Sequence, residues 1–181
     1  GGLESLTVRV PTGVWVTELD VDDGDATVRN VSGELALSID DGDADIGPLD
    51  GGLSVDGDDG DVTVAQVDRF SAELDDGAVT MNEPATLGDV RVDDGDLDLS
   101  VDGIADDSVV RADDGDVTVR LSPSLDATVV CTQNDGTIQF DGDVFDEVET
   151  VGNEFRGRIG DGSDRLTVDV DDGRVSIEAL S

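Results

Sequence analysis

The chain has 181 residues, of which 36% are hydrophobic and only 3% aromatic, and it carries a formal charge of −36 without any histidine. A charge of this sign and size repels nucleic-acid phosphates and anionic lipid headgroups, so we expect no nucleic-acid partner. The single cysteine, Cys131, excludes an intrachain disulfide bond. High net charge can mark a disordered chain, but the apolar periodicity described below favours a folded one.

The first 21 residues are the least regular part of the chain, and we expect them to form an N-terminal coil or cap in which Trp15 covers the core. The opening Gly1-Gly2 is typical of a trimmed or tagged start, which fits a removed signal or lipid-anchor segment upstream. No hydrophobic stretch is long enough to span a bilayer, so we expect no membrane span within this chain.

Residues 22–140 repeat one acidic tripeptide at a nearly fixed interval. Asp-Asp-Gly ends at Gly24, Gly42, Gly60, Gly77, Gly95, Gly115 and Gly173, and Asn134-Asp135-Gly136 is a near copy. From Gly24 to Gly136, the steps between successive corner glycines are 18, 18, 17, 18, 20 and 21 residues. A period near 18 indicates one structural unit that is stacked on itself.

Each repeat predicts two short strands around its acidic corner. Apolar residues stand two and four positions after the glycine, as Val62 and Val64 show, and five and three positions before it, as Leu37 and Ile39 show. Polar residues alternate with them, which is typical of half-buried strands. We therefore predict that residues 1–181 form one all-β domain. It is a single-stranded parallel β-solenoid (β-helix) of about eight coils of roughly 18 residues, with the shape of a right-handed triangular prism.

An antiparallel sandwich is the competing fold, because Asp-Gly between alternating strands is also a strong hairpin signal. The period breaks at residues 141–165, which we interpret as an insertion or cap. Its apolar anchors are Val144, Phe145, Phe155 and Ile159. Residues 166–181 resume the pattern as the last coil. Cys131 falls in an inward column of the repeat, so we expect a buried and inert thiol.

Several phrases of the repeat resemble the adhesin-like β-solenoid family, a domain of unknown function, over nearly the whole chain. They are Gly-Asp-Val-Thr-Val at 60–64 and 115–119, and Gly160-Asp161-Gly162, Leu166-Thr167-Val168 and Asp172-Gly173 near the C-terminus. This resemblance implies a cell-surface or envelope protein without a known activity. The coil length is also similar to that of bactofilins and their archaeal relatives, the halofilins, which are β-helices that polymerise end to end.

The abundance of aspartate and the absence of lysine resemble a halophilic archaeal proteome. At molar ionic strength the Debye length is about 3 Å, so surface carboxylates barely interact with one another. The chain also lacks tyrosine and histidine, and no serine stands in a nucleophile motif. We therefore expect no enzyme activity and no catalytic or cofactor-binding residues.

The stacked corners are instead a candidate cation ladder that would bind Ca²⁺, Mg²⁺ or Na⁺/K⁺ weakly. The alternative is that aspartate starts each turn by accepting a bond from its own backbone, glycine supplies a positive φ, and the charge keeps the surface hydrated. The ladder residues are Asp22, Asp23, Asp25, Asp40, Asp41, Asp43, Asp58, Asp59, Asp61, Asp93, Asp94, Asp96, Asp113, Asp114 and Asp116.

These patterns predict a structural scaffold of the cell envelope or cytoskeleton in a halophile, which forms a homopolymer by end-to-end stacking of coils. We expect it on the extracellular side of the membrane, with envelope or surface-layer components as further partners and the cytoplasmic cytoskeleton as the alternative location. The alternative function is a monomeric surface adhesin or cation-binding module that uses a side face. The candidate assembly residues are Leu6, Val8, Val10, Val175, Ile177 and Leu180.

Overall fold

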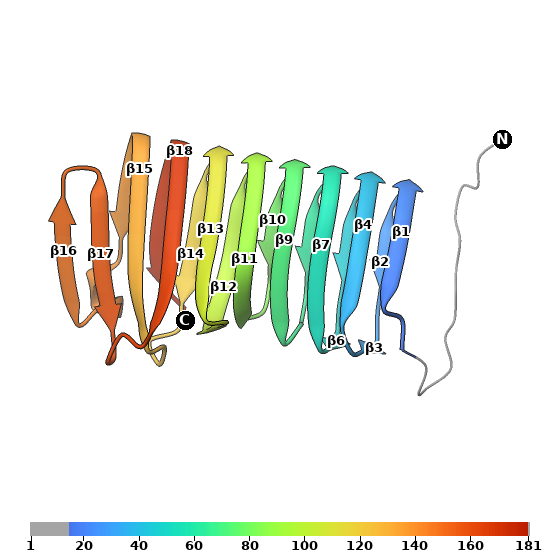
Figure 1. The fold of residues 1–181 in the computed structure, drawn as a ribbon, viewed down its shortest axis with the longest axis horizontal. Coiled ribbons are helices and arrows are strands. Elements are labelled where there is room, and N and C mark those ends of the chain that lie inside the picture. Colours follow the sequence, from blue (N-terminus) through green and yellow to red (C-terminus); the bar gives the residue numbers. More distant parts are fainter. Residues whose placement is uncertain (1–14, 181) are drawn as a thin grey trace.

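A computed structural model describes residues 15–180 of the chain as a rod of stacked strands (Figure 1). The prediction of an all-β fold is confirmed, since the only helical segment in these residues is one 3-10 turn. Among the same residues, no helix is long and apolar enough to cross a membrane. The elements are β1 (Glu18–Asp23), β2 (Ala26–Val28), β3 (Val31–Ser32), β4 (Leu35–Asp41), β5 (Ala44–Ile46), β6 (Leu49–Asp50), β7 (Gly52–Asp59), β8 (Val62–Val64), β9 (Arg69–Asp76), β10 (Val79–Met81), β11 (Ala85–Asp94), β12 (Leu97–Ile104), β13 (Asp107–Asp114), β14 (Val117–Leu121), β15 (Ala127–Phe140), η1 (Gly142–Val144), β16 (Glu147–Val151), β17 (Glu154–Ile159) and β18 (Asp164–Ala179).

Strands of successive repeats pair in parallel, and the two strands of one repeat do not form a hairpin. β1 pairs with β4, which places Leu19 opposite Leu37, and β2 pairs with β5, which places Ala26 opposite Ala44. Both pairings join residues that are 18 positions apart, so one period of the sequence forms one layer of the rod. The antiparallel sandwich is therefore wrong for the repeat region, because each Asp-Asp-Gly turns the chain between two faces of the rod.

Two faces of the rod are long ladders of parallel strands. One face holds the strands that precede each corner, in the order β1-β4-β7-β9-β11-β13-β18, and the other holds the strands that follow it, in the order β2-β5-β8-β10-β12-β14-β18. We call these the first face and the second face. Short pairings of β3 with β6, and of β11 with β12, run along a third side.

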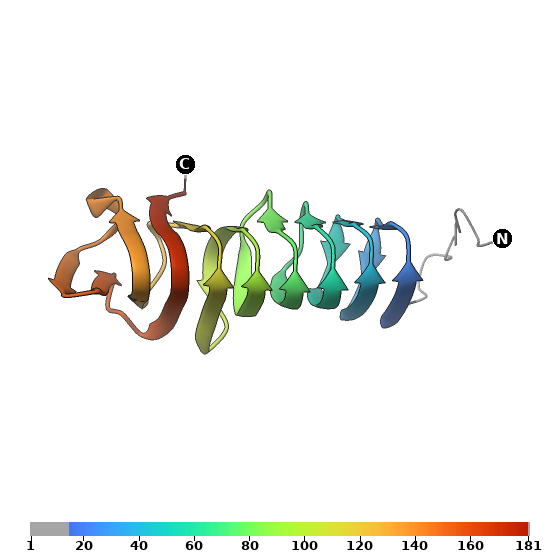
Figure 2. The same cartoon turned by 90° about the horizontal axis from the view of Figure 1, so that it is seen from above.

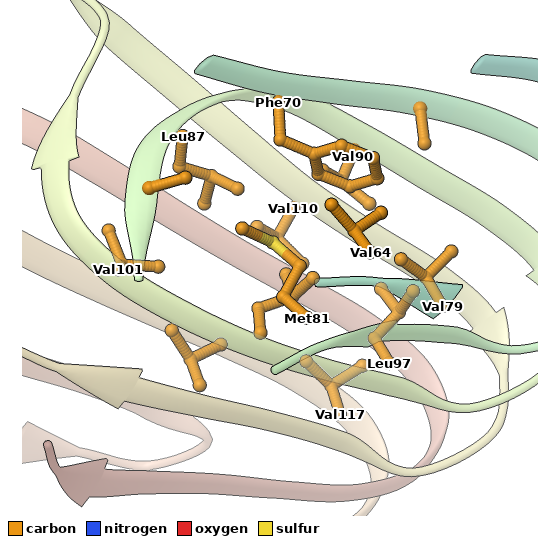
Figure 3. Packing of buried hydrophobic residues seen from close by; sticks show 14 of the residues in the cluster. Val64, Phe70, Val79, Met81, Leu87, Val90, Leu97, Val101, Val110 and Val117 are labelled. Carbon is orange, nitrogen blue, oxygen red and sulfur yellow. The ribbon is translucent and has the colours of Figure 1, made fainter. Parts of the chain in front are cut away.

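The core lies between these faces and consists of aliphatic columns with one residue per layer. Val79, Leu97 and Val117 follow one another on β10, β12 and β14, and all three are buried (Figure 3). Phe70 is fully buried in the same core beside Leu87. Most residues of the columns are aliphatic, and Gly57 and Gln133 are exceptions in one of them. The inward positions that the alternation predicts are therefore, for the most part, the positions that pack.

The corner glycines form a column of their own. Gly60 has a φ of +147°, which disfavours other residues. A Cβ atom on Gly60 would also run into the carbonyl oxygen of Gly42 in the layer before it. The same clash with a neighbouring glycine carbonyl recurs at every corner glycine except Gly24, and these include Gly173 and Gly136. Glycine is therefore required at the corner by backbone conformation and by close stacking of the layers.

The order of the layers departs from the order of the sequence at one end of the rod. β18 pairs with β13 and β14 on one side and with β15 on the other (Figures 1 and 2). The sequence predicts residues 166–181 as the last coil, but their strand lies inside the stack and β15 lies outside it. Periodicity could not reveal this order, because β15 and β18 carry the same columns of inward residues.

Residues 141–165 contain the part of the structure that is not parallel. η1 is followed by the hairpin of β16 and β17, and β17 pairs in antiparallel fashion with residues 127–132 of β15. The four apolar anchors that the sequence predicts for this segment, Val144, Phe145, Phe155 and Ile159, are all buried. The hairpin thus lengthens the first face by two strands beyond β15.

Candidate functional site: the acidic corners and the β15 end

The corner aspartates stack in columns along one edge of the rod, as the repeat predicts. The strand register places Asp41 opposite Asp59, Asp76 opposite Asp94, and Asp114 opposite Asp172. The complete column of second corner residues, in spatial order, is Asp23, Asp41, Asp59, Asp76, Asp94, Asp114, Asp172 and Asp135. The aspartates that precede them, Asp22, Asp40, Asp58 and Asp93, are exposed, and Asp113 is half-buried.

Five of the eight corner glycines are followed by an aspartate, and this third aspartate of the corner links its layer to the next one. A carboxylate oxygen of Asp96 accepts a hydrogen bond of 2.8 Å from the backbone N–H of Asp116. Asp43 accepts one of 3.1 Å from the N–H of Asp61, and Asp25 accepts one of 3.4 Å from the N–H of Asp43. These side chains therefore satisfy backbone donors at the turn, which gives the third aspartate a structural role that does not need a cation.

The crowding of carboxylates affects proton binding in the middle of the column. Partial desolvation, and then the neighbouring carboxylates of Asp59 and Asp94, raise the pKa of Asp76 above its ordinary value. Like charges next to a carboxylate disfavour its ionised form. The column therefore carries a repulsion that screening by salt would relieve.

The carboxylates form a line and not a cage. Within residues 15–180, no group of three or more aspartate, glutamate or cysteine side chains is arranged to hold a metal ion. The shallow depression over Asp25, Asp43, Asp45 and Asp61 is open to solvent and spreads across three layers. Weak cation binding along the ladder stays a prediction.

Cys131 lies in the core, as the sequence predicts. It is fully buried on β15, where it faces Val168 of β18 and Phe155 of β17 across the strand pairings. Burial, and then the charge of Asp169, raise the pKa of its thiol to about 12. A thiolate, which is the reactive form, is therefore strongly disfavoured at this position.

The predicted assembly residues at the C-terminus are not at an end of the rod. Val175 and Ile177 are fully buried in β18, between β14 and β15, so their assignment to an end-to-end contact is wrong. Leu180 is half-buried and donates its backbone N–H to the carbonyl of Leu121 at 2.8 Å. The other three candidates, Leu6, Val8 and Val10, lie outside the described residues.

Three of the four phenylalanines of the chain lie together at the β15 end. The ring of Phe155 lies 4.4 Å from that of Phe140 and 5.2 Å from that of Phe145, measured between centroids. Phe155 is fully buried, whereas Phe140 is 41% exposed. This aromatic cluster closes the aliphatic core on the side of the hairpin and leaves Phe140 facing outward.

Beside Phe140, a cleft of about 210 Å³ separates the end of β15 from the hairpin tip. Its walls include Gln133, Thr137 and Phe140 from β15, and Thr150 and Glu154 from the hairpin. Val151, which ends β16, is 66% exposed at the same tip. The cleft could not be predicted from the sequence. The repeat period does not indicate that the hairpin covers only the first face and leaves the second half of β15 open.

Ion pairs of arginine connect β18 to the layer of β13 and β14, and the arginines that form them can be found in the sequence. Arg174 stands where most repeats have an aspartate, and its guanidinium lies 3.4 Å from the carboxylate of Asp116 on the preceding layer. Arg111 on β13 reaches Asp171 at 3.6 Å, and Arg120 on β14 reaches Glu178 at 3.5 Å. Arg174 breaks a column that otherwise contains mostly aspartates. This substitution could have indicated that Arg174 pairs with an acidic residue of an earlier repeat, and therefore that β18 lies next to that repeat.

Comparison with known proteins places this architecture in a family. A crystal structure of a "putative cell adhesion protein" from Clostridium sporogenes is similar to the chain at 13% identity and a TM-score of 0.43, and the alignment covers 96% of this chain and 97% of that one. No curated protein matches the chain in sequence. The family described as Toastrack DUF4097 matches residues 51–178, which is more than half of the chain. The protein therefore belongs to the Toastrack DUF4097 family, a β-solenoid-like domain of unknown function.

Proposed function

We propose that the protein is a non-enzymatic structural rod of the cell surface that is adapted to concentrated salt. The observation that carries this proposal is the column of eight corner aspartates, one on each layer, in a chain of net charge −36. Neighbouring strands are about 4.8 Å apart, and molar salt reduces the Debye length to about 3 Å. Salt of this strength removes most of the repulsion between layers.

A regular coil supports the structural role. We propose eight coils, because eight corner glycines stack in one column, and a right-handed triangular prism, because parallel crossovers are right-handed in nearly all proteins. A stack of this kind is stiff along its length, since every layer is bonded to the next through the backbone. The third aspartate of the corner adds a side-chain bond between several of the layers.

The chemistry of the described residues supports a role without catalysis. Most corner aspartates are exposed, and the thiol of Cys131 is buried in the core. We propose that the corners attract cations diffusely, with Na⁺, K⁺, Mg²⁺ or Ca²⁺ bound weakly along the column. The outside of a halophilic archaeal cell, with a lipid anchor upstream, is the location that we propose.

A monomeric surface adhesin is the second candidate, and the hairpin favours it. β17 and β16 lengthen the first face by two strands, whereas the second face ends at β15. Two flat end coils therefore cannot meet across this end, which disfavours a polymer made by simple stacking of coils. An adhesin would use a surface of the single rod instead.

The salt dependence of folding tests the structural proposal. The full chain is placed in KCl from about 0.1 M to about 3 M, and thermal unfolding is followed by circular dichroism while X-ray scattering reports its shape. We expect an elongated particle at high salt and a midpoint Tm that rises steeply with salt. A Tm that is independent of salt would contradict the adaptation of the acidic column.

A further inference from the structure

The second face of the rod ends in an unpaired strand edge. Residues 134–140 of β15 pair with β18 on one side, and no other strand of residues 15–180 pairs with them on the other side. The first half of β15 differs, because β17 covers residues 127–132. Free N–H and C=O groups along an edge are a template for an added strand.

The surroundings of this edge suit a segment of low charge. Of the eleven residues that line the cleft beside it, only Glu154 is charged, on a protein of net charge −36. Phe140 is 41% exposed and Val151 is 66% exposed, so apolar surface is available next to the free backbone. An added strand with apolar residues at alternate positions would pair with the free backbone edge and cover the exposed apolar side chains.

The N-terminal segment of the chain has the chemistry that this edge requires. Residues 1–14 contain one acidic and one basic residue, Glu4 and Arg9, and so have no net charge. Within them, Leu6-Thr7-Val8-Arg9-Val10 alternates as a strand does and matches Leu166-Thr167-Val168-Asp169-Val170 at four of five positions. The second sequence belongs to β18, which pairs with strands on both of its edges.

The segment cannot reach the cleft of its own molecule. β15 lies seven strands away from β1 in the order of pairing, which is about 34 Å at the usual strand spacing. Val10 is five residues before Trp15, and five extended residues span at most about 18 Å. Figure 1 shows β1 and β15 at opposite ends of the rod. The donor must therefore be a second copy of the chain.

We propose that residues 6–10 of one molecule add as a strand to the edge of residues 134–140 of a second molecule, so that rods join head to tail. The apolar side chains of Leu6, Val8 and Val10 cover Phe140 and the cleft, and the backbone completes the second face beside the hairpin. Only Glu154 among the residues that line the cleft is charged, so few charges face the added strand where two strongly acidic rods meet. This proposal goes beyond the salt-adapted rod, whose test does not depend on it.

Complementation between two full-length variants tests the proposal at molar KCl. Val8→Asp disables the donor segment, and Phe140→Asp disables the cleft. We expect the wild type to increase in mass with concentration in sedimentation experiments and each variant alone to stay monomeric. An equimolar mixture should give dimers and nothing larger, because one intact donor and one intact cleft remain.

Controls separate docking from folding. Val151→Asp changes an exposed residue at the hairpin tip, next to the cleft and outside the core, and it should weaken association without lowering Tm. Thr63→Asp adds the same charge in the middle of the rod and should leave association unchanged. A wild type that is monomeric at every concentration would overturn the proposal. A Val8→Asp variant that is destabilised without any change in mass would do the same, because the segment would then pair within its own molecule, in the columns of Ala26 and Val28.

Discussion

At the scale of single residues, each position of the acidic corner has its own physical role. The glycine allows the turn and the close approach of layers, and the third aspartate accepts a backbone hydrogen bond from the next layer. The second aspartate stands in a column of like charges. These roles can be separated by substitution, because the repeat offers the same corner in several environments.

The glycine column predicts a difference between two alanine substitutions. Gly60→Ala places a Cβ against the carbonyl of Gly42, whereas a Cβ at Gly24, in the first layer of residues 15–180, meets no atom of these residues within 4 Å. Both glycines have positive φ, at +147° and +112°. We expect Gly60→Ala to destabilise the fold by at least about 1 kcal/mol more than Gly24→Ala in urea unfolding. Equal losses would mean that the layers can move apart.

The third aspartate predicts a rescue by asparagine. Asp96→Ala leaves the N–H of Asp116 without its acceptor, and Asp96→Asn keeps an acceptor oxygen while it removes the same charge. We expect the alanine variant to be less stable than the asparagine variant by about 1 kcal/mol in urea unfolding. If the two variants had equal stability, the carboxylate would act through its charge alone.

The raised pKa of Asp76 predicts a stabilising substitution. A folded-state pKa above the unfolded one means that ionised Asp76 destabilises the fold, and that this effect fades as the pH falls through the folded-state pKa. Asp76→Asn should therefore raise Tm at neutral pH and low salt. The gain should disappear in acid and become smaller in molar KCl, because salt screens the neighbouring carboxylates but does not reverse the desolvation of Asp76. Asp56→Asn removes one exposed charge outside the column and is the control. An equal gain from this control would assign the effect to net charge.

At the scale of elements, β18 is the strand on which the β15 end depends. It is buried between two layers, and Ile177 near its C-terminal end is fully buried, whereas Ile138 at the open edge of β15 is only half-buried. We expect Ile177→Ala to destabilise the protein by about 2–5 kcal/mol and Ile138→Ala by clearly less. Chemical unfolding of both variants measures the difference. A similar loss at both positions would be inconsistent with an internal β18.

The sequence predicts the columns of this fold better than their order. Alternation around the corners identifies the buried positions, as Leu37 and Val64 show, and the broken period identifies the buried anchors of residues 141–165. Period and alternation cannot distinguish a strand that is next in sequence from a strand that is next in space. For this reason the prediction that Val175 and Ile177 lie at an end of the rod was wrong, and the cleft beside β15 was not predicted.

At the scale of the whole molecule, the acidic surface predicts a general response to salt. Within residues 15–180, no three acidic side chains surround a common point where a metal ion could bind. Screening depends on ionic strength and not on a particular ion. We therefore expect NaCl and CaCl₂ at matched ionic strength to raise Tm equally, as measured by differential scanning calorimetry. A larger rise with Ca²⁺ would show that the ladder selects divalent cations.

The internal position of β18 also has a consequence for synthesis on the ribosome. Layers from β1 to β14 can form in the order in which they are translated, since each one docks on the layer before it. β15 cannot take its final place in this way, because the strand between it and β14 is translated later. Closure of the rod must therefore wait until residues 164–179 have left the exit tunnel. Most layers of the rod can therefore form before β18 is translated, and the β15 end is completed only after it.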